Sequence, residues 1–116
     1  MLPFLKALFG GEPLGDRSGR YQFRRGLLNP FNEAVSGGFS VRFRWPDTVE
    51  YREGDKLLKA YMEMLSGRVN ISLDSRSIRR WEPPVADEPL TTEKKQQIIE
   101  GVCAAASFLG IRYVIR

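Results

Sequence analysis

The side chains that most often carry catalysis are scarce in this sequence. It contains no histidine, which removes Ser-His-Asp and Cys-His nucleophile systems, His-ligated metal sites and the commonest general base near neutral pH. Its one cysteine, Cys103, allows neither an intramolecular disulfide nor a cysteine-based metal cluster. Because Val102 and Ala104 flank it, we expect a buried helical position where the thiol fills apolar space and is unreactive. We therefore predict no metal, no cofactor and no catalytic residue of these types.

The carboxylates are the other candidates for acid–base chemistry. The closest groups fall in predicted turns or at strand edges, and they are Glu50, Glu53 and Asp55, and Asp87 with Glu88. A catalytic pair must face across a dry cleft that shifts a pKa, whereas solvated turn charges are the commoner arrangement. The glycines match neither a Walker loop nor a dinucleotide fingerprint. The residues therefore predict a protein that is not an enzyme, with carboxylate chemistry as the less favoured alternative.

Arginine recurs beside aromatic residues in three segments, 20–25, 41–45 and 79–81. Aromatic rings flanked by guanidinium groups suit single-stranded nucleic acid, where bases stack and phosphates pair with the cations. They also suit a protein interface, and a plain pleated strand with arginines outward gives the same pattern without any binding role. Of the two binding interpretations, we favour a protein contact over nucleic acid. The predicted contact residues are Arg24, Arg25, Arg42, Arg44 and Arg79.

Length and charge place the chain among single-domain globular proteins. A chain of 116 residues has room for one core, and 42% hydrophobic with 28% charged residues indicates neither disorder nor a membrane protein. Eighteen basic against fourteen acidic residues give a net charge of +4. This modest excess permits nucleic acid binding but does not argue for it, because dedicated binders usually segregate their charge more strongly.

The first part of the chain is predicted as an arm. Residues 1–10 are apolar, but Pro3 and Lys6 interrupt them, so we expect a short docking helix and neither a signal peptide nor a membrane span. A cytoplasmic protein is the resulting prediction. Turn-forming residues fill much of 10–38, with one possible short strand at 21–24. We therefore divide the chain into a short helix and irregular arm over 1–37 and a single α+β domain over 38–116.

The domain opens with alternating residues that predict strands. Phe39, Val41, Phe43 and Trp45 alternate with polar residues, which indicates a strand with these four side chains buried. A returning strand follows at 48–52, and further strands are predicted at 69–73 and 77–81. Residues 56–65 fit a helix by residue type and a strand by their place between tight turns; we favour the strand. The result is an antiparallel meander of about five short strands.

One clear helix must cover this sheet. Pro89 precedes it, Thr91 or Thr92 can cap it, and Gly110 can end it. Its apolar stripe is Ile98, Ile99, Val102, Cys103, Ala106 and Leu109. The fold prediction is therefore α+β, a mainly antiparallel meander covered on one face by one long C-terminal helix, with a short final strand at 111–116. Trp81 is expected to be a core residue below the proline turn.

The uncovered edge of that final strand is a candidate site of self-association. An unpaired strand edge exposes a row of N–H and C=O groups that a second chain can join. We therefore keep a homodimer through residues 111–115 as a possible assembly.

Two motifs in the second half of the chain carry a family resemblance. They are the segments 77–84 (Ser-Ile-Arg-Arg-Trp-Glu-Pro-Pro) and 88–98 (Glu-Pro-Leu-Thr-Thr-Glu-Lys-Lys-Gln-Gln-Ile), followed by a helix and a short strand after Gly110. The turn at 51–54 is also similar. Through these features, residues 38–116 resemble the immunity protein 74 family of bacterial polymorphic toxin systems.

The resemblance implies a small α+β protein that binds and neutralises a cognate toxin without turnover. It brings no toxin-contact residues with it, so the five arginines named above rest on their sequence context alone. The leading hypothesis is therefore a cytoplasmic, non-catalytic immunity protein. The competing hypothesis is a small nucleic-acid-binding module that uses the strands rich in arginine and aromatic residues.

Overall fold

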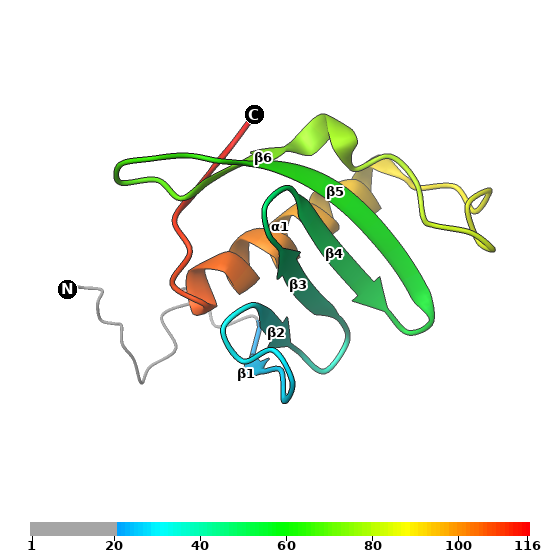
Figure 1. Ribbon diagram of the computed structural model, residues 1–116. Helices are drawn as coiled ribbons and strands as arrows, with labels where there is room; N and C mark the ends of the chain where they lie inside the picture. The colour runs from blue at the N-terminus through cyan, green and yellow to red at the C-terminus, as the bar shows by residue number, and fades with distance from the viewer. Residues whose placement is uncertain (1–20) are drawn as a thin grey trace.

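The computed structural model describes residues 21–116, and the helix predicted at 1–10 lies outside this part of the chain. Seven strands form one curled sheet, with a single long helix behind it (Figure 1). The strands are β1 (Arg24–Arg25), β2 (Glu33–Val35), β3 (Ser40–Arg44), β4 (Thr48–Glu53), β5 (Lys56–Met64), β6 (Ile71–Asp74) and β7 (Tyr113–Ile115). A short 3-10 helix, η1 (Ser75–Ser77), follows β6, and α1 spans Thr92–Phe108.

Each strand lies beside its neighbours in the sequence, in the order β1 to β7. All pairs are antiparallel except β6 with β7, which run parallel. A parallel pair needs a crossover, and the chain from η1 through α1 provides it. The predicted α+β fold, a mainly antiparallel meander with one long helix and a short final strand, is confirmed.

Alternation along the strands sends one set of side chains into the core. Across β3, β4 and β5, Val41 pairs with Tyr51 and Tyr51 with Leu58, and all three are buried. They share the core with helix residues such as Ile98 and Val102. Because side chains alternate between the two faces of a sheet, the intervening residues face away from α1. The opposite face is consequently polar.

Residues 56–65 form a strand, as we favoured, and the helix alternative is wrong. β5 pairs with β4 along its first part and with β6 at its end. Leu58, Ala60 and Met62 are buried, while Lys59 and Tyr61 are exposed. Good helix formers adopt a strand here because hydrogen bonds to two neighbouring strands and burial of one face outweigh a small intrinsic preference.

The segment 21–37 is more ordered than the irregular arm that we predicted. β1 and β2 lie within it and extend the sheet beyond β3. Arg25 pairs with Ala34, which in turn pairs with Val41. The strand expected at 21–24 occurs instead at Arg24–Arg25. Turn-forming residues concealed these strands because each is only two or three residues long.

The strand predicted at 77–81 is wrong. Asp74 accepts a hydrogen bond from the Arg76 amide, and the Ser77 hydroxyl donates to the Asp74 carbonyl, so the chain curls into η1. It then runs beside β5, where the Glu82 amide donates to the Leu57 carbonyl at 2.7 Å. Local side-chain hydrogen bonds of this kind compete with the ladder of a sheet and here replace it.

Helix α1 begins and ends where its caps predict. The Thr91 side chain accepts from the Lys94 amide, and Gly110 follows the helix with a φ of 79°. Of the expected stripe, Ile98, Val102 and Ala106 are buried, and Ile99, Cys103 and Leu109 are partly buried. Gly101 is also buried, and the Phe39 ring packs so close to it that a β-carbon there would lie only 3.0 Å from the ring. The missing side chain lets Phe39 pack against the helix.

Trp81 is a core residue, as predicted, with 1% of its surface exposed. Its ring lies 6.3 Å from the Tyr51 ring, and the Lys56 ammonium lies 5.4 Å above it. Lys56 also pairs with Glu88 at 2.5 Å, and this hydrogen bond raises the pKa of the lysine. Trp81 and Lys56 together attach the segment 82–90 to the start of β5.

A hydrogen-bonded trio joins α1 to β4. The Tyr51 hydroxyl donates to Glu53 at 2.9 Å, and Lys94 pairs with the same carboxylate at 2.8 Å. Burial and the neighbouring Glu53 raise the pKa of Tyr51 above its usual range. Burial by itself would raise the pKa of Glu53, but the hydrogen bonds from Lys94 and Tyr51 outweigh it and lower that pKa. The trio holds an ionised carboxylate at the junction.

Replacing Trp81 tests its place in the core. Trp81→Ala is expected to lower the free energy of unfolding by about 3–5 kcal/mol, because it removes the largest fully buried side chain. The exposed neighbour provides a control, and Arg80→Ala should change stability by less than about 0.5 kcal/mol. Urea denaturation followed by circular dichroism measures both, and Trp81→Phe gives an intermediate value if the alanine variant does not fold. Equal losses at Trp81 and Arg80 would contradict the buried position.

The charge of Glu53 gives a stability that depends on pH. Because its pKa in the folded state lies below the ordinary 4.5, its contribution is complete above that value and is lost as the pH falls through the lower pKa. We expect Glu53→Gln to be less stable than the wild type by up to about 1 kcal/mol at pH 7, a magnitude limited by partial exposure. The difference should shrink below about pH 4.5 in urea denaturation series. A constant Glu53→Gln difference down to about pH 3 would refute the assignment.

Candidate functional site

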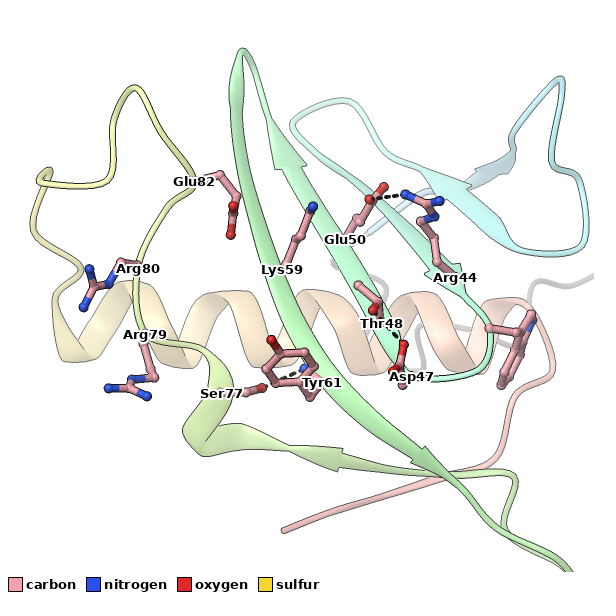
Figure 2. A pocket seen from close by; sticks show the side chains of 11 residues that line it. Arg44, Asp47, Thr48, Glu50, Lys59, Tyr61, Ser77, Arg79, Arg80 and Glu82 are labelled. Atoms are coloured by element: carbon pink, nitrogen blue, oxygen red, sulfur yellow. Dashed lines mark hydrogen bonds and ion pairs between the residues drawn. The ribbon is translucent and has the colours of Figure 1, made fainter.

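A polar depression of about 730 Å3 lies on the face of the sheet opposite α1 (Figure 2). We call it the basin. β3 to β5 form its floor, and the segment 77–82 forms one wall. Its lining residues are Arg44, Trp45, Asp47, Thr48, Glu50, Lys59, Tyr61, Ser77, Arg79, Arg80 and Glu82.

The floor is built from two rows of side chains that run across the strands. One row joins Arg42, Glu50 and Lys59, and the other joins Arg44, Thr48 and Tyr61. Directly opposed side chains on one face of an antiparallel pair lie close enough to interact. Glu50 therefore has a cation on each side in its row, and Arg44 also reaches it diagonally at 3.1 Å. This arrangement compensates a carboxylate that is otherwise buried.

The wall depends on hydrogen bonds between distant parts of the chain. The Tyr61 amide donates to the Ser77 hydroxyl at 2.8 Å, and the Glu82 amide donates to Leu57. These bonds hold the segment 77–82 against β5, with Ile78 and Trp81 in the core. The residues between them point outward, so Arg79 and Arg80 are exposed at the basin.

The basin carries both signs of charge. Four of its residues are basic and three are acidic. The basic residues are Arg44, Lys59, Arg79 and Arg80, and the acidic residues are Asp47, Glu50 and Glu82. Arg44 is paired with Glu50. Within residues 21–116, no carboxylate forms an ion pair with Arg79 or Arg80. Lys59 on the floor forms no ion pair within these residues either, so the cations of the basin without a carboxylate partner there are Lys59, Arg79 and Arg80.

The structure brings only part of the predicted contact residues together. Arg44 and Arg79 both line the basin. Arg42 lies on the same face beside Glu50 and is 4.0 Å from Glu33. Arg24 and Arg25 lie on β1 at the far edge of the sheet, and Arg25 packs on the α1 side, 5.7 Å from the Phe108 ring.

Of the eleven lining residues, the sequence singled out only Arg44 and Arg79 as contacts, and four of the other nine show why. Lys59 and Tyr61 belong to the segment whose strand character was ambiguous, and a firm assignment of alternation there would have placed both on the polar face. Arg80 was overlooked beside Arg79. Trp45 was expected inside, but 40% of it is exposed because β3 ends at Arg44. Its indole N–H donates to Asn32 at 3.3 Å.

Two aliphatic hydroxyl groups of the basin, those of Ser77 and Thr48, make hydrogen bonds within the fold. Ser77 donates to the Asp74 carbonyl and accepts from the Tyr61 amide. Thr48 donates to Asp47 at 3.0 Å. A nucleophilic hydroxyl needs a base that takes its proton, and the Ser77 proton is already given to a backbone carbonyl, which cannot serve as that base. No group of three or more metal-ligating side chains occurs among residues 21–116.

Cys103 is partly buried on α1, away from the basin-lining residues. Burial raises the pKa of its thiol, and although a hydrogen bond with Tyr113 acts in the opposite direction, nearby Glu100 raises it further. Because the thiolate is the reactive form, a raised pKa agrees with the unreactive thiol that we expected. The full burial that we predicted is only partial here.

In the described part of the chain, no helix is both long and apolar enough to cross a bilayer.

Comparisons with known proteins assign the chain to a family. No curated protein and no solved structure matches the chain. A family model, immunity protein 74, matches residues 46–116, which is more than half of the sequence. The match includes β4 to β7, α1 and all the basin residues except Arg44 and Trp45. This chain therefore belongs to the immunity protein 74 family.

Proposed function

We propose that this protein neutralises a cognate bacterial toxin by forming a direct, non-catalytic complex with it in the cytoplasm, and that the basin is the contact surface. The observation that carries the proposal is the overlap of the family match with the basin. Nine of the eleven lining residues lie within 46–116, from Asp47 to Glu82. A role shared by the family is expected to use a surface that its shared segment builds.

The composition of the basin supports a protein partner. Tyr61 and Trp45 are exposed, and Arg79 and Arg80 stand beside them without ion pairs among residues 21–116. Tyrosine, tryptophan and arginine are the residues that most often dominate the binding energy of protein interfaces. Rigid strands hold the floor, so these side chains bind with little ordering cost.

Nucleic acid is the weaker candidate. The exposed rings of Trp45 and Tyr61 could stack with bases, and the arginines of the wall could pair with phosphates. Asp47 and Glu82, however, form no ion pair within residues 21–116, and these two carboxylates in the same basin would repel a phosphate backbone. The balance of charges therefore favours a partner that presents both signs, as a protein surface does.

Pairing with a second copy through β7 stays a separate proposal. β7 is the last strand of the sheet, and Val114 and Ile115 are exposed on it. The Arg116 amide donates inward to the Leu73 carbonyl, and among residues 21–116 β6 is the strand that pairs with β7, which is three residues long. This edge lies apart from the basin, so self-association and toxin binding can be measured independently.

Charge reversal on the wall tests the contact surface. We expect Arg79→Glu/Arg80→Glu to weaken binding of the toxin encoded beside this gene by roughly 10–100-fold, because exposed arginines of an interface are frequent hot spots. Calorimetric titration against a catalytically inactive form of the toxin measures the change in affinity. Growth of cells that co-express the active toxin measures protection.

A matched control separates the basin from overall charge. Arg68→Glu/Arg76→Glu makes the same change at two exposed positions outside the basin, and it should bind within about threefold of the wild type. Absence of any complex with the wild-type protein would refute the proposed function. Equal losses in the two double variants would refute the basin as the contact surface.

A salt titration tests the nucleic acid alternative. If the partner is a protein, we expect no salt-sensitive binding to single-stranded or duplex DNA or RNA. Salt-sensitive binding here means an affinity that falls steeply between about 50 and 200 mM salt. Fluorescence anisotropy with labelled oligonucleotides measures it, and the Arg79→Glu/Arg80→Glu variant provides the comparison. Strong binding to RNA or DNA that salt and this variant both abolish would support the alternative instead.

A further inference from the structure

The connection between β1 and β2 exposes three large apolar side chains at one point. Leu27, Leu28 and Phe31 are exposed over 89%, 91% and 78% of their surface. We call them the apolar tip. The loop that carries them extends beyond the sheet at the lower edge of Figure 1, drawn in blue and cyan. Solvent exposure of three neighbouring apolar side chains is unfavourable unless they are covered by a partner.

Hydrogen bonds hold the loop in one shape. The Asn29 carbonyl accepts from the amides of Asn32 and Glu33, and the Gly26 amide donates to the Glu33 carbonyl at 2.9 Å. A β-carbon on buried Gly26 would collide with the Glu33 side chain, so the close approach of the two strands requires glycine. The Arg25 guanidinium donates to the Pro30 carbonyl at 2.6 Å. The tip is therefore preorganised, which lowers the entropy cost of binding.

The tip and the basin form one continuous surface. Trp45 lines the basin, and its indole N–H donates to the Asn32 side chain at the base of the tip. The Phe43 amide donates to the Asn32 carbonyl at 2.8 Å, which fixes the loop to β3. A partner that occupies the basin over Trp45 is therefore adjacent to the tip.

Charges around the tip indicate the chemistry of its partner. Arg24 and Arg25 are exposed, and neither forms an ion pair within residues 21–116. Arg42 and Arg44, by contrast, are compensated by Glu33 and Glu50. Unpaired guanidinium groups beside an apolar projection are complementary to an apolar pocket with a carboxylate rim.

A protein fits these observations better than a lipid surface. Arg25 folds back onto the Pro30 carbonyl at 2.6 Å and lies 6.0 Å from the Phe31 ring. Arg24 donates to the Arg25 carbonyl at the longer distance of 3.4 Å, so its exposed guanidinium is the more available charge next to the tip. Asp47 and Glu50 lie on the adjoining surface, where anionic headgroups would meet them unfavourably. Three apolar side chains with so little basic charge make a poor membrane anchor.

We propose that the apolar tip inserts into an apolar, acid-rimmed pocket of the toxin that occupies the basin, and that it supplies the anchor of the complex. This inference rests on the proposed function. The tip precedes residues 46–116, so it lies outside the segment that matches the family model. The basin thus belongs largely to the shared segment, whereas the tip gives this chain a contact of its own and determines which toxin it fits.

Replacing the tip tests the inference. Leu27→Ser/Leu28→Ser/Phe31→Ser should fold normally by circular dichroism, because these side chains are already exposed, and should weaken binding to the catalytically inactive toxin by at least about 100-fold. Met64→Ser/Leu65→Ser removes exposed apolar groups at the turn after β5 and should stay within about threefold of the wild type. Arg24→Glu should weaken binding at least about tenfold if the rim is acidic.

The possible outcomes separate this inference from the proposed function. A complex that survives the tip substitutions within threefold overturns the tip as an anchor and leaves the basin proposal standing. No complex with the wild type overturns both. Vesicles of phosphatidylglycerol and phosphatidylethanolamine and sedimentation of the isolated protein are measured in parallel. Lipid binding or self-association that the tip substitutions abolish, with toxin affinity unchanged, identifies a membrane or a second copy as the partner and overturns the inference.

Discussion

Packing of α1 against one face of the sheet is the interaction on which the other features of this structure depend. A single helix covers one face only, so the apolar residues of β3 to β6 must fall on that side, as Val41, Tyr51, Leu58 and Leu73 do. The hydrophobic effect fixes the register of every strand, because a slip by one residue would turn each apolar side chain outward. The opposite face is left polar, and it is there that the basin forms.

The segment 77–82 shows how the core and the candidate site are coupled. Ile78 and Trp81 are buried, while Arg79 and Arg80 between them face the basin. Irregular backbone usually stays mobile unless it is fastened, and this segment is fastened by Trp81 in the core and by hydrogen bonds to β5. The same few residues thus hold the fold together and present the arginines of the wall.

The basin carries charges of both signs, which distinguishes it from a uniformly basic surface. Glu50 is buried among cations on a rigid floor, and the arginines of the wall have no carboxylate partner within residues 21–116. A partner must match both signs at once, which disfavours a uniform phosphate backbone and favours one particular protein surface. The apolar tip adds a contact of a different kind at the side of the basin, in a segment that precedes the family match.

The sequence by itself determined the fold class, the single covering helix and the buried position of Trp81. Periods of two and 3.6 residues, a threonine cap and a terminal glycine are local signals that packing then reinforced. Alternation and aromatic neighbours, which are visible along the chain, also led to Arg44 and Arg79, two of the five predicted contact arginines, and both line the basin. Only the tertiary structure brought those two arginines to one basin with Lys59 and Tyr61.

The remaining differences depend on hydrogen bonds that the strand and helix periods do not show. Residues 77–81 are not a strand because local bonds to Asp74 curl the chain into η1, and the Tyr61 amide, sixteen residues away, holds the Ser77 side chain in that position. Trp45 is exposed because β3 ends before it and Asn32 accepts its N–H from another strand connection. Hydrogen bonds between residues distant in the sequence decide such positions, and no local pattern encodes them. The sequence determined features that depend on local, periodic patterns, such as strands, the helix and its caps. The tertiary structure decided which side chains from separate segments lie together in the basin.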